Sequence, residues 1–313
     1  MTCTWGPSAI QRFASNVFGR TLATIPRGLK KCVLLPPLSL STITNEIQIF
    51  CQEAVVWKRL THPNILPLLG VTITPFQLVS NWMSGGDLPD YLKKNSDADR
   101  LKLVGAPPVV SIPCSLQAQL SDVVEGLYHL HSCNVIHGDL KGVCNCSISR
   151  FITVLTPIQP NVLVDHSGNA LIADFGLATV TQNLDSIQSA THQAGHTPRW
   201  AAPEVLKEGT LSKEADIFSF AMVMIEVRYR LSTTCIALAN CCFVSIQVFT
   251  GAIPFSDQPS AMAMLNMMQG RRPSQPTHPT FTAELWMLME RCWNQSPQLR
   301  PEVSEVLNAL RGV

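Results

Sequence analysis

Carboxylate, amide and lysine side chains that could do chemistry lie in turn-like segments of the sequence. One segment is Val135-Ile-His-Gly-Asp-Leu-Lys141, which leads from apolar residues into a polar turn at Asp139. A second is Ile172-Ala-Asp-Phe-Gly-Leu-Ala178, a strand-like run that breaks at Asp174, and a third is Arg199-Trp-Ala-Ala-Pro-Glu204. Hard cations choose oxygen ligands of this kind. An Asp-Phe-Gly alone is usually only a turn, but chance is a poor explanation for all three segments in this order.

The order HGDLKG, NVLVD, ADFGLA and APE resembles the catalytic half of a protein kinase. The segments FCQEAVVWKRLTHPNILPLLGV, LVSNWMSGGDL and HTPRWAAPEVL more narrowly resemble the tyrosine-kinase-like serine/threonine kinases abundant in mushroom-forming fungi. The resemblance runs from about residue 50 to about residue 310. It implies transfer of the terminal phosphate of ATP, with Mg²⁺, to a Ser or Thr hydroxyl of a protein substrate.

The resemblance also implies a role for each catalytic side chain. Asp139 would accept or orient the proton of the substrate hydroxyl, and Lys141 would meet charge on the transferred group. Asn161 would hold one magnesium ion, and Asp174 would hold magnesium that bridges the phosphates. The position of Lys141, two residues after Asp139, resembles serine/threonine rather than tyrosine kinases.

In the N-terminal part, apolar periodicity over Phe50–Leu60 predicts an amphipathic helix that carries Glu53. By resemblance Glu53 pairs with the ATP-binding lysine, although a solvated glutamate on an exposed face is the alternative. Lys30 is the nearest match for that lysine, with Lys31 as its rival.

The segment Leu78-Val-Ser-Asn-Trp-Met83 resembles the strand and hinge that contact the adenine ring. Ser80 then holds the position that controls access behind the ring, and Met83 ends the hinge. ATP would bind between the two lobes.

Further residues resemble structural contacts of the family. Glu204 and Arg300 would form a buried ion pair, and Asp216 would accept backbone hydrogen bonds around His137. Thr197 would touch the catalytic Asp and Lys side chains. We also expect a buried helix that begins after Asp216.

An eroded glycine-rich loop, the doubtful ATP-binding lysine Lys30 and a disrupted helix favour a non-catalytic pseudokinase or scaffold as the alternative function. The segment Arg12–Leu22 has the outline of a glycine-rich phosphate loop, but Ala14 and Ser15 replace two of its glycines. Gly138 replaces the arginine that would grip a phosphorylated activation segment. We therefore expect weakened ATP binding and activity that does not depend on phosphorylation of that segment.

Three segments have no place in the family pattern: 104–119, 143–159 and 227–247. Each begins with Val and ends with Gln, and removing all three restores the family register and leaves 259 residues. Valine codons begin with GT and one glutamine codon is CAG, the letters that open and close spliceosomal introns. We interpret the segments as translated introns, with functional surface loops as the alternative.

Composition excludes several other classes of protein. The net charge of +1 gives no field that would attract nucleic acid or anionic lipid. No secretory signal is recognisable, so we expect a cytoplasmic protein with reduced cysteines rather than disulfides. A zinc site at Cys144/Cys146 or Cys241/Cys242 is disfavoured by the missing second ligand pair. The apolar run 231–249 contains several polar residues, so we do not expect a membrane span.

The fold expected from these segments is α+β, with the two-lobed architecture of a protein kinase. Residues 1–313 would form one kinase domain, with a small N-lobe of strands and one helix over about 1–83. A larger helical C-lobe would follow over about 84–313, with the three inserts inside it. The sequence does not indicate an oligomeric state.

Overall fold

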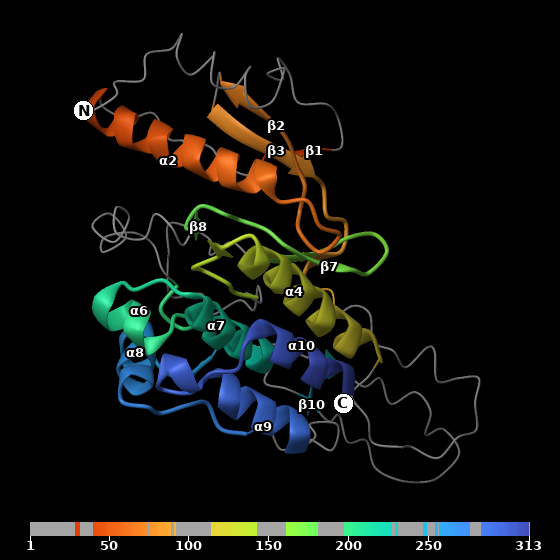
Figure 1. Ribbon diagram of the computed structural model, residues 1–313, viewed down its shortest axis with the longest axis vertical. Helices are drawn as coiled ribbons and strands as arrows, with labels where there is room; N and C mark the ends of the chain where they lie inside the picture. Colours follow the sequence, from red (N-terminus) through yellow and green to blue (C-terminus); the bar gives the residue numbers. More distant parts are fainter. Residues whose placement is uncertain are drawn as a thin grey trace, which may run out of the picture.

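Two groups of elements lie one above the other in the computed structural model of the chain (Figure 1). The structure describes residues 29–31, 40–73, 76–88, 91, 114–142, 161–180, 197–226, 229–230, 247–248, 254–255, 257–275 and 283–312. Its elements in chain order are β1 (Leu29–Lys31), α2 (Leu40–Arg59), β2 (Leu68–Ile73), β3 (Phe76–Asn81), β4 (Gly86–Asp87), α4 (Cys114–Ser132), β5 (Val135–Ile136), β6 (Val162–Val164), β7 (Ala170–Ile172), β8 (Thr179–Val180), α6 (Pro203–Glu208), α7 (Lys213–Glu226), β9 (Tyr229–Arg230), β10 (Gln247–Val248), α8 (Ser260–Met268), α9 (Ala283–Cys292), the 3-10 turn Pro297–Leu299 and α10 (Val303–Gly312).

The upper group is an antiparallel sheet in the order β1-β3-β2 with helix α2 beside it. Phe50, Cys51, Ala54 and Trp57 are buried at helical spacing, and this apolar stripe packs α2 into the core. Lys58 and Arg59 in its last turn suit the negative end of the helix dipole. The helix predicted for Phe50–Leu60 is confirmed, and it begins earlier, at Leu40.

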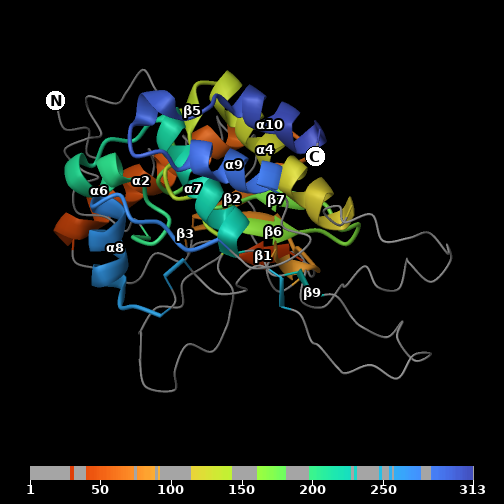
Figure 2. The ribbon, with the colours of Figure 1, turned by 90° about the horizontal axis from the view of Figure 1, so that it is seen from below.

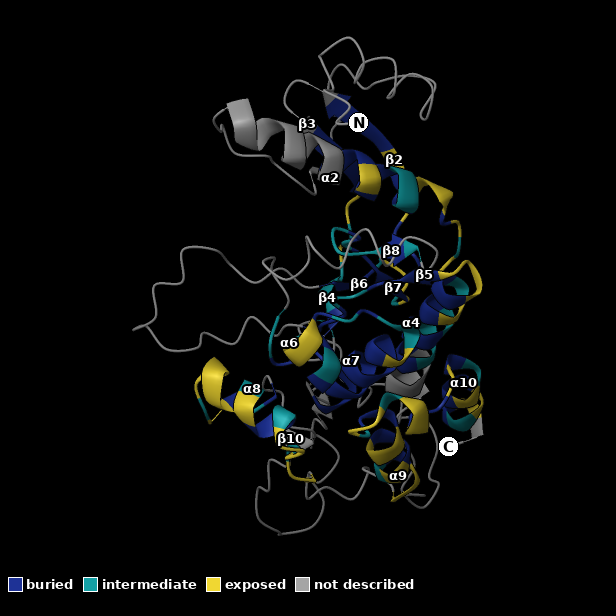
Figure 3. Ribbon diagram, turned by 60° about the vertical axis from the view of Figure 1, so that its left-hand side comes forward, coloured by how far each residue is buried: buried dark blue, intermediate teal, exposed yellow. Residues whose placement is uncertain are grey.

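The lower group is built around α7, whose residues from Ala215 to Ile225 are all buried. A helix that is apolar on every side must be enclosed by other elements. Figure 2 shows α4, α9 and α10 close to α7, and Figure 3 shows α7 in the buried colour. The expectation that this helix begins after Asp216 was wrong, because it begins at Lys213 and Asp216 lies in its first turn. The α+β class and the two-lobed arrangement are confirmed.

Two small sheets between these groups position the polar turns. Strands β4, β6 and β7 pair in that order, with Val162 opposite Ile172. Strands β5 and β8 pair with Val135 opposite Val180. Strands β6 and β7 are fully buried, so the residues that follow them are held rigidly.

The described residues include or flank parts of the three segments that the sequence analysis interprets as inserts, 104–119, 143–159 and 227–247. Helix α4 begins at Cys114, so the last six residues of the first insert are helical. At the second insert, the Asn161 N–H donates to the Lys141 carbonyl at 3.2 Å. At the third, α7 ends at Glu226, the residue before the insert, and the short strands β9 and β10 pair with each other. The remaining insert residues lie outside the described part of the chain.

None of the helices in the described part of the chain combines the length and the apolar character that a bilayer crossing requires. The apolar run 231–249 lies outside the described residues except for Gln247 and Val248.

Candidate active site

The turn after β5 is fixed by the buried carboxylate of Asp216. Its Oδ2 accepts the backbone N–H of His137 and its Oδ1 accepts that of Gly138, both at 2.9 Å. His131 Nε2 also lies 2.9 Å from Oδ2. Gly138 has φ 83°, a left-handed conformation that suits glycine. The predicted contact between Asp216 and the backbone around His137 is confirmed, and it sets the direction in which the next residue, Asp139, leaves the turn.

Asp139 is the centre of a polar network that joins three separate segments. Thr197 donates its backbone N–H to Asp139 Oδ1 at 3.0 Å, and Lys141 Nζ donates to Asp139 Oδ2 at 2.5 Å. Lys141 Nζ also donates to Thr197 Oγ1 at 3.0 Å, which confirms the predicted contacts of Thr197. Asn161 Nδ2 donates to the Asp139 carbonyl at 2.7 Å. The structure therefore brings Asp139, Lys141 and Asn161 together, although the 17-residue segment 143–159 lies between Lys141 and Asn161 in the sequence.

Asn161 and Asp174 come from the facing ends of β6 and β7. The Ala173 N–H donates to the Asn161 carbonyl at 2.8 Å, so Asp174 follows directly after a residue bonded to Asn161. Asn161 Oδ1 is buried, and within the described residues it has no hydrogen-bond partner. Buried acceptors are normally satisfied, so this oxygen fits a cation ligand.

A magnesium ion at this point would need additional ligands. Among the described residues no group of three or more His, Cys, Asp or Glu side chains could hold a metal ion. Mg²⁺ is commonly held by one or two carboxylates together with substrate phosphates and water. The oxygen of Asn161 and the carboxylate of Asp174 fit that mode of binding.

The backbone at Asp174 is strained, with φ 66° for a residue other than glycine. The next residue, Phe175, is fully buried, and its ring centroid lies 5.5 Å from that of Trp57 and 5.6 Å from that of His137. Phe175 thus connects helix α2 to the turn that carries Asp139. These contacts hold the Asp174 turn in its unusual conformation.

Glu53 projects from α2 toward the same turn. A Cβ atom placed on Gly176 would lie 3.4 Å from Asp174 Oδ1 and 3.7 Å from Glu53 Oε2, so both carboxylates flank this glycine. Burial, and secondly the charge of Asp174, raise the pKa of Glu53 to about 8. Its Oε1 has no hydrogen-bond partner among the described residues. A buried carboxyl of this kind is a suitable partner for a cation, and the alternative of a solvated surface glutamate was wrong.

The register of the upper sheet separates the two candidate lysines. Lys30 is opposite Ser80, and Lys31 is opposite Val79. Leu78 belongs to the core cluster that includes α2, and Ser80, two residues on, shares its face of the strand. Because directly opposed residues lie on one face, Lys30 holds a position on the α2 side and Lys31 on the other. The register favours Lys30. Its pairing with Glu53 stays a prediction, because the lysine side chains are not among those that the structure describes.

The predicted adenine strand is β3. Ser80 is fully buried. Met83 follows the strand, is partly buried against the core, and accepts the Gly86 N–H at 3.2 Å through its carbonyl. These positions suit a strand and hinge, but contact with a nucleotide stays a prediction.

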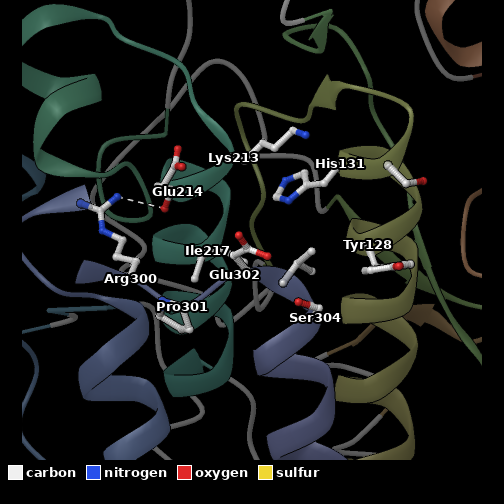
Figure 4. Close-up of a pocket in the computed structure, with 11 residues that line it drawn as sticks. Tyr128, His131, Lys213, Glu214, Ile217, Arg300, Pro301, Glu302 and Ser304 are labelled. Carbon is white, nitrogen blue, oxygen red and sulfur yellow. Dashed lines mark hydrogen bonds between the residues drawn. The ribbon is translucent and has the colours of Figure 1, made fainter. Parts of the chain in front are cut away.

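Arg300 links the segment that contains Glu204 to the rest of the lower group. Its Nη1 and Nη2 donate to the two carboxylate oxygens of Glu204 at 2.6 and 2.8 Å. Nη1 also donates to the Glu214 carbonyl at 2.9 Å, as Figure 4 shows at the edge of a cavity of about 310 Å³. The predicted ion pair is confirmed, with Arg300 buried and Glu204 partly buried, and its bidentate geometry fixes the start of α6.

Several segments singled out by sequence lie outside the described residues. These are the phosphate-loop segment 12–22, residues 181–196 of the activation segment, and the cysteine pairs 144/146 and 241/242. The interpretations placed on them stay predictions.

Comparison with known proteins decides the family. A sequence profile described as "Protein tyrosine and serine/threonine kinase" matches residues 17–310, most of the chain. The chain belongs to this protein kinase family. Similar proteins include serine/threonine-protein kinase STY17 of Arabidopsis thaliana, 29% identical over 83% of this chain and 36% of that protein. Serine/threonine-protein kinase TNNI3K of Mus musculus is 28% identical over 85% of this chain and 26% of that protein. Dual specificity protein kinase pyk3 of Dictyostelium discoideum is 26% identical over 96% of this chain and 18% of that protein.

These coverages show that the chain spans about a third or less of the length of these kinases. What the matches share with this chain is therefore the kinase segment itself. Protein kinases in general use ATP and Mg²⁺.

Two residues of this kinase fold were not predicted from sequence. His131 supports Asp216 from helix α4, and Arg199 donates to carbonyls of the segment after β10. Arg199 lies in a segment that the sequence had singled out, but its contacts are 55 or more positions away. No local pattern could have indicated them.

Proposed function

We propose that this chain is an ATP-dependent protein serine/threonine kinase that transfers the γ-phosphate of ATP to a Ser or Thr hydroxyl of a protein substrate. The observation that carries the proposal is the network in which Asp139 contacts Lys141, Thr197 and Asn161. The family match and the serine/threonine kinases among the similar proteins support it. The position of Lys141, two residues after Asp139 and in contact with Thr197, favours Ser or Thr as the acceptor.

Each catalytic side chain has a role that follows from its contacts. Asp139 has one carboxylate oxygen held by the Thr197 N–H and the other by Lys141, which keeps its orientation toward an incoming hydroxyl. Lys141 remains close enough to meet charge on the transferred phosphoryl group. Asn161 and Asp174 would hold magnesium, which neutralises charge on the phosphates.

The nucleotide would lie between the upper and lower groups. Lys30, opposite Ser80 on β1, would contact the phosphates and pair with Glu53. Ser80 and Met83 would border the adenine ring. A lysine ammonium beside Glu53 would favour its charged carboxylate and so oppose the burial that raises the pKa of this group.

Turnover and nucleotide binding test this function separately. We expect the chain with Mg²⁺ and ATP to incorporate phosphate into a generic protein substrate, and Asp139→Asn to abolish incorporation while ATP still shifts the melting temperature. Asp165→Asn, in the exposed turn between β6 and β7, is the matched control and should keep activity. Binding of ATP without turnover, unchanged by Asp139→Asn, would instead support the pseudokinase alternative.

We further propose that segments 104–119, 143–159 and 227–247 are translated introns in a kinase of the fungal tyrosine-kinase-like expansion. The hydrogen bond from the Asn161 N–H to the Lys141 carbonyl supports this for the second segment. Without residues 143–159 the chain reads Lys141-Gly142-Pro160-Asn161, and the same bond then has the i to i+3 spacing of a β-turn.

The other two segments interrupt helices. Removing the third joins Glu226, where α7 ends, to Val248, and the sequence MVMIE-VFTG then continues the apolar helix to Gly251, a suitable end. Removing the first joins Leu103 to Leu120 and places Leu103 at the buried helical position of Gln119.

Sequencing the mature message across the three boundaries tests the intron proposal. A message without all three segments supports it. Peptides mapped by mass spectrometry inside 227–247 would contradict it and favour functional surface loops.

The remaining expectations belong to the same proposal. Residues 1–313 would be one kinase domain, with the lobes meeting near Met83. We propose protein rather than nucleic acid or membrane partners on the basis of the near-neutral charge. A cytoplasmic location is proposed from the sequence analysis alone.

A further inference from the structure

Arg199 is a buried arginine whose described hydrogen bonds all end on backbone carbonyls. Its Nη1 donates to the carbonyls of Pro254 at 2.7 Å and Phe255 at 2.5 Å, and its Nη2 donates to that of Gln258 at 2.5 Å. The residue is 7% exposed. Burying a guanidinium is costly, and such contacts are made where its planar fork fixes the position of another segment.

The three carbonyls belong to one tight loop. The Gln258 N–H donates to the Phe255 carbonyl at 3.0 Å, and Phe255 has φ 53°, a strained value for a large side chain. Gln258 Oε1 accepts a hydrogen bond from Asn266 Nδ2, which ties the loop to helix α8. Arg199 therefore holds a strained loop in place, and that loop leads directly into α8.

On its other side Arg199 belongs to the turn that contacts the catalytic aspartate. The Trp200 N–H donates to the Thr197 carbonyl at 3.1 Å, so Arg199 lies inside this turn. Thr197 donates to Asp139, and Ser219 of α7 donates to the Trp200 carbonyl at 2.9 Å. The turn is thus fixed at the catalytic residue, at α7 and, through Arg199, at loop 254–258.

We propose that Arg199 is a positioning residue for the protein substrate. It holds the Thr197–Trp200 turn and loop 254–258 as one platform beside Asp139, the residue that an acceptor hydroxyl must reach. Helix α8, which follows the loop, lies next to α6 in both views (Figures 1 and 2). The nucleotide residues proposed above lie on β1, β3 and α2, away from these contacts. The inference rests on the proposed kinase function.

The test compares Arg199→Lys with Arg272→Lys in the 313-residue chain. Lysine keeps the charge but cannot reach three carbonyls in the geometry of a guanidinium. Arg272 is the matched control because its guanidinium also donates to carbonyls, those of Trp293 and Met267, at the far end of α8. Myelin basic protein serves as the acceptor, and its KM and the KM for ATP are measured with kcat.

We expect Arg199→Lys to raise the KM for myelin basic protein about tenfold, with kcat and the KM for ATP within twofold of the unmodified chain. Arg272→Lys should lower the melting temperature without changing either KM. A purely structural role for Arg199 predicts the same pattern for both variants, and that result would overturn the proposal.

Hydrogen exchange provides a second measurement that does not need turnover. Arg199→Lys should speed exchange of the Trp200 amide at least tenfold, and Arg272→Lys should not. If the unmodified chain shows no turnover, the kinase proposal fails, while this measurement still decides whether Arg199 holds the Thr197–Trp200 turn. Unchanged exchange at Trp200 in Arg199→Lys would overturn it.

Discussion

Deleting residues 104–119 should stabilise the protein, because it exchanges a poorly satisfied buried amide for an apolar side chain. Gln119 is 3% exposed, its Nε2 donates to the Gly168 carbonyl at 3.0 Å, and its Oε1 has no partner among the described residues. An unsatisfied buried acceptor costs about 1–3 kcal/mol. The deletion places Leu103 at this position, and burying a leucine contributes about 1.5–3 kcal/mol.

Losing the bond to Gly168 offsets about 0.5–1.5 kcal/mol of this gain. That carbonyl belongs to a partly exposed residue, so water can replace the lost donor. The net increase in the free energy of unfolding is then about 1–5 kcal/mol. For a chain of this size each kcal/mol raises the melting temperature by about 2–4 °C.

Urea unfolding followed by tryptophan fluorescence measures this difference. The matched control is deletion of residues 104–118, which shortens the chain almost equally but leaves Gln119 before Leu120. Loop shortening alone changes the closure entropy of both variants by nearly the same amount. The 104–119 deletion should therefore be the more stable by about 1–5 kcal/mol, and equal stability of the two variants would refute the reasoning.

Four further outcomes follow from the site. Asp174→Asn should lower phosphate incorporation at least 100-fold in a Mg²⁺-ATP assay, and retained activity would remove Asp174 from the proposed metal site. Because the pKa of Glu53 is raised, the folded state keeps a proton that the unfolded state loses, so the free energy of unfolding should fall between about pH 4.5 and pH 8. The slope should reach at most about 1.4 kcal/mol per pH unit and should disappear in Glu53→Gln; a slope that persists would point to another group. Arg300→Ala leaves the partly buried Glu204 without its partner and should destabilise the protein by about 2–4 kcal/mol in denaturant titrations, whereas a change under 1 kcal/mol would contradict the role of this pair. Alanine at the Ser and Thr residues between Thr179 and Ser189 should leave the rate within about twofold, because Gly138 offers no guanidinium to a phosphorylated segment; a large loss of rate would count against this.

The polar network around Asp139 could be predicted from sequence because its signals are local. Asp139 and Lys141 lie two positions apart on one turn, and Asp174 lies in a short motif whose turn residues are recognisable. Asn161 was predicted from the NVLVD motif, whose distance from Asp139 matches the family pattern once residues 143–159 are left out. The bond from Asn161 to the Lys141 carbonyl shows that the chain does return to that point.

The features that could not be predicted from sequence depend on contacts between residues far apart in the chain. Apolar periodicity indicated α2 from Phe50, but nothing in it fixed the start at Leu40. The choice between Lys30 and Lys31 required the register of β1 against β3, which neighbouring residues do not encode. The contacts of Arg199 with loop 254–258 likewise join segments that are far apart in sequence.

The three segments differ in how much of the fold each affects. The second leaves the network of Asp139 and Asn161 closed, because Lys141 and Asn161, which flank the segment, are joined by a backbone hydrogen bond. The first affects one buried position of α4, at Gln119. The third ends α7 at Glu226, and α7 is the element around which the lower group packs. Loss of packing there lowers stability everywhere that α7 touches, including the Trp200 turn held by Ser219. If the 313-residue chain is inactive while ATP still binds, deletion of 227–247 should therefore restore more activity than deletion of 143–159.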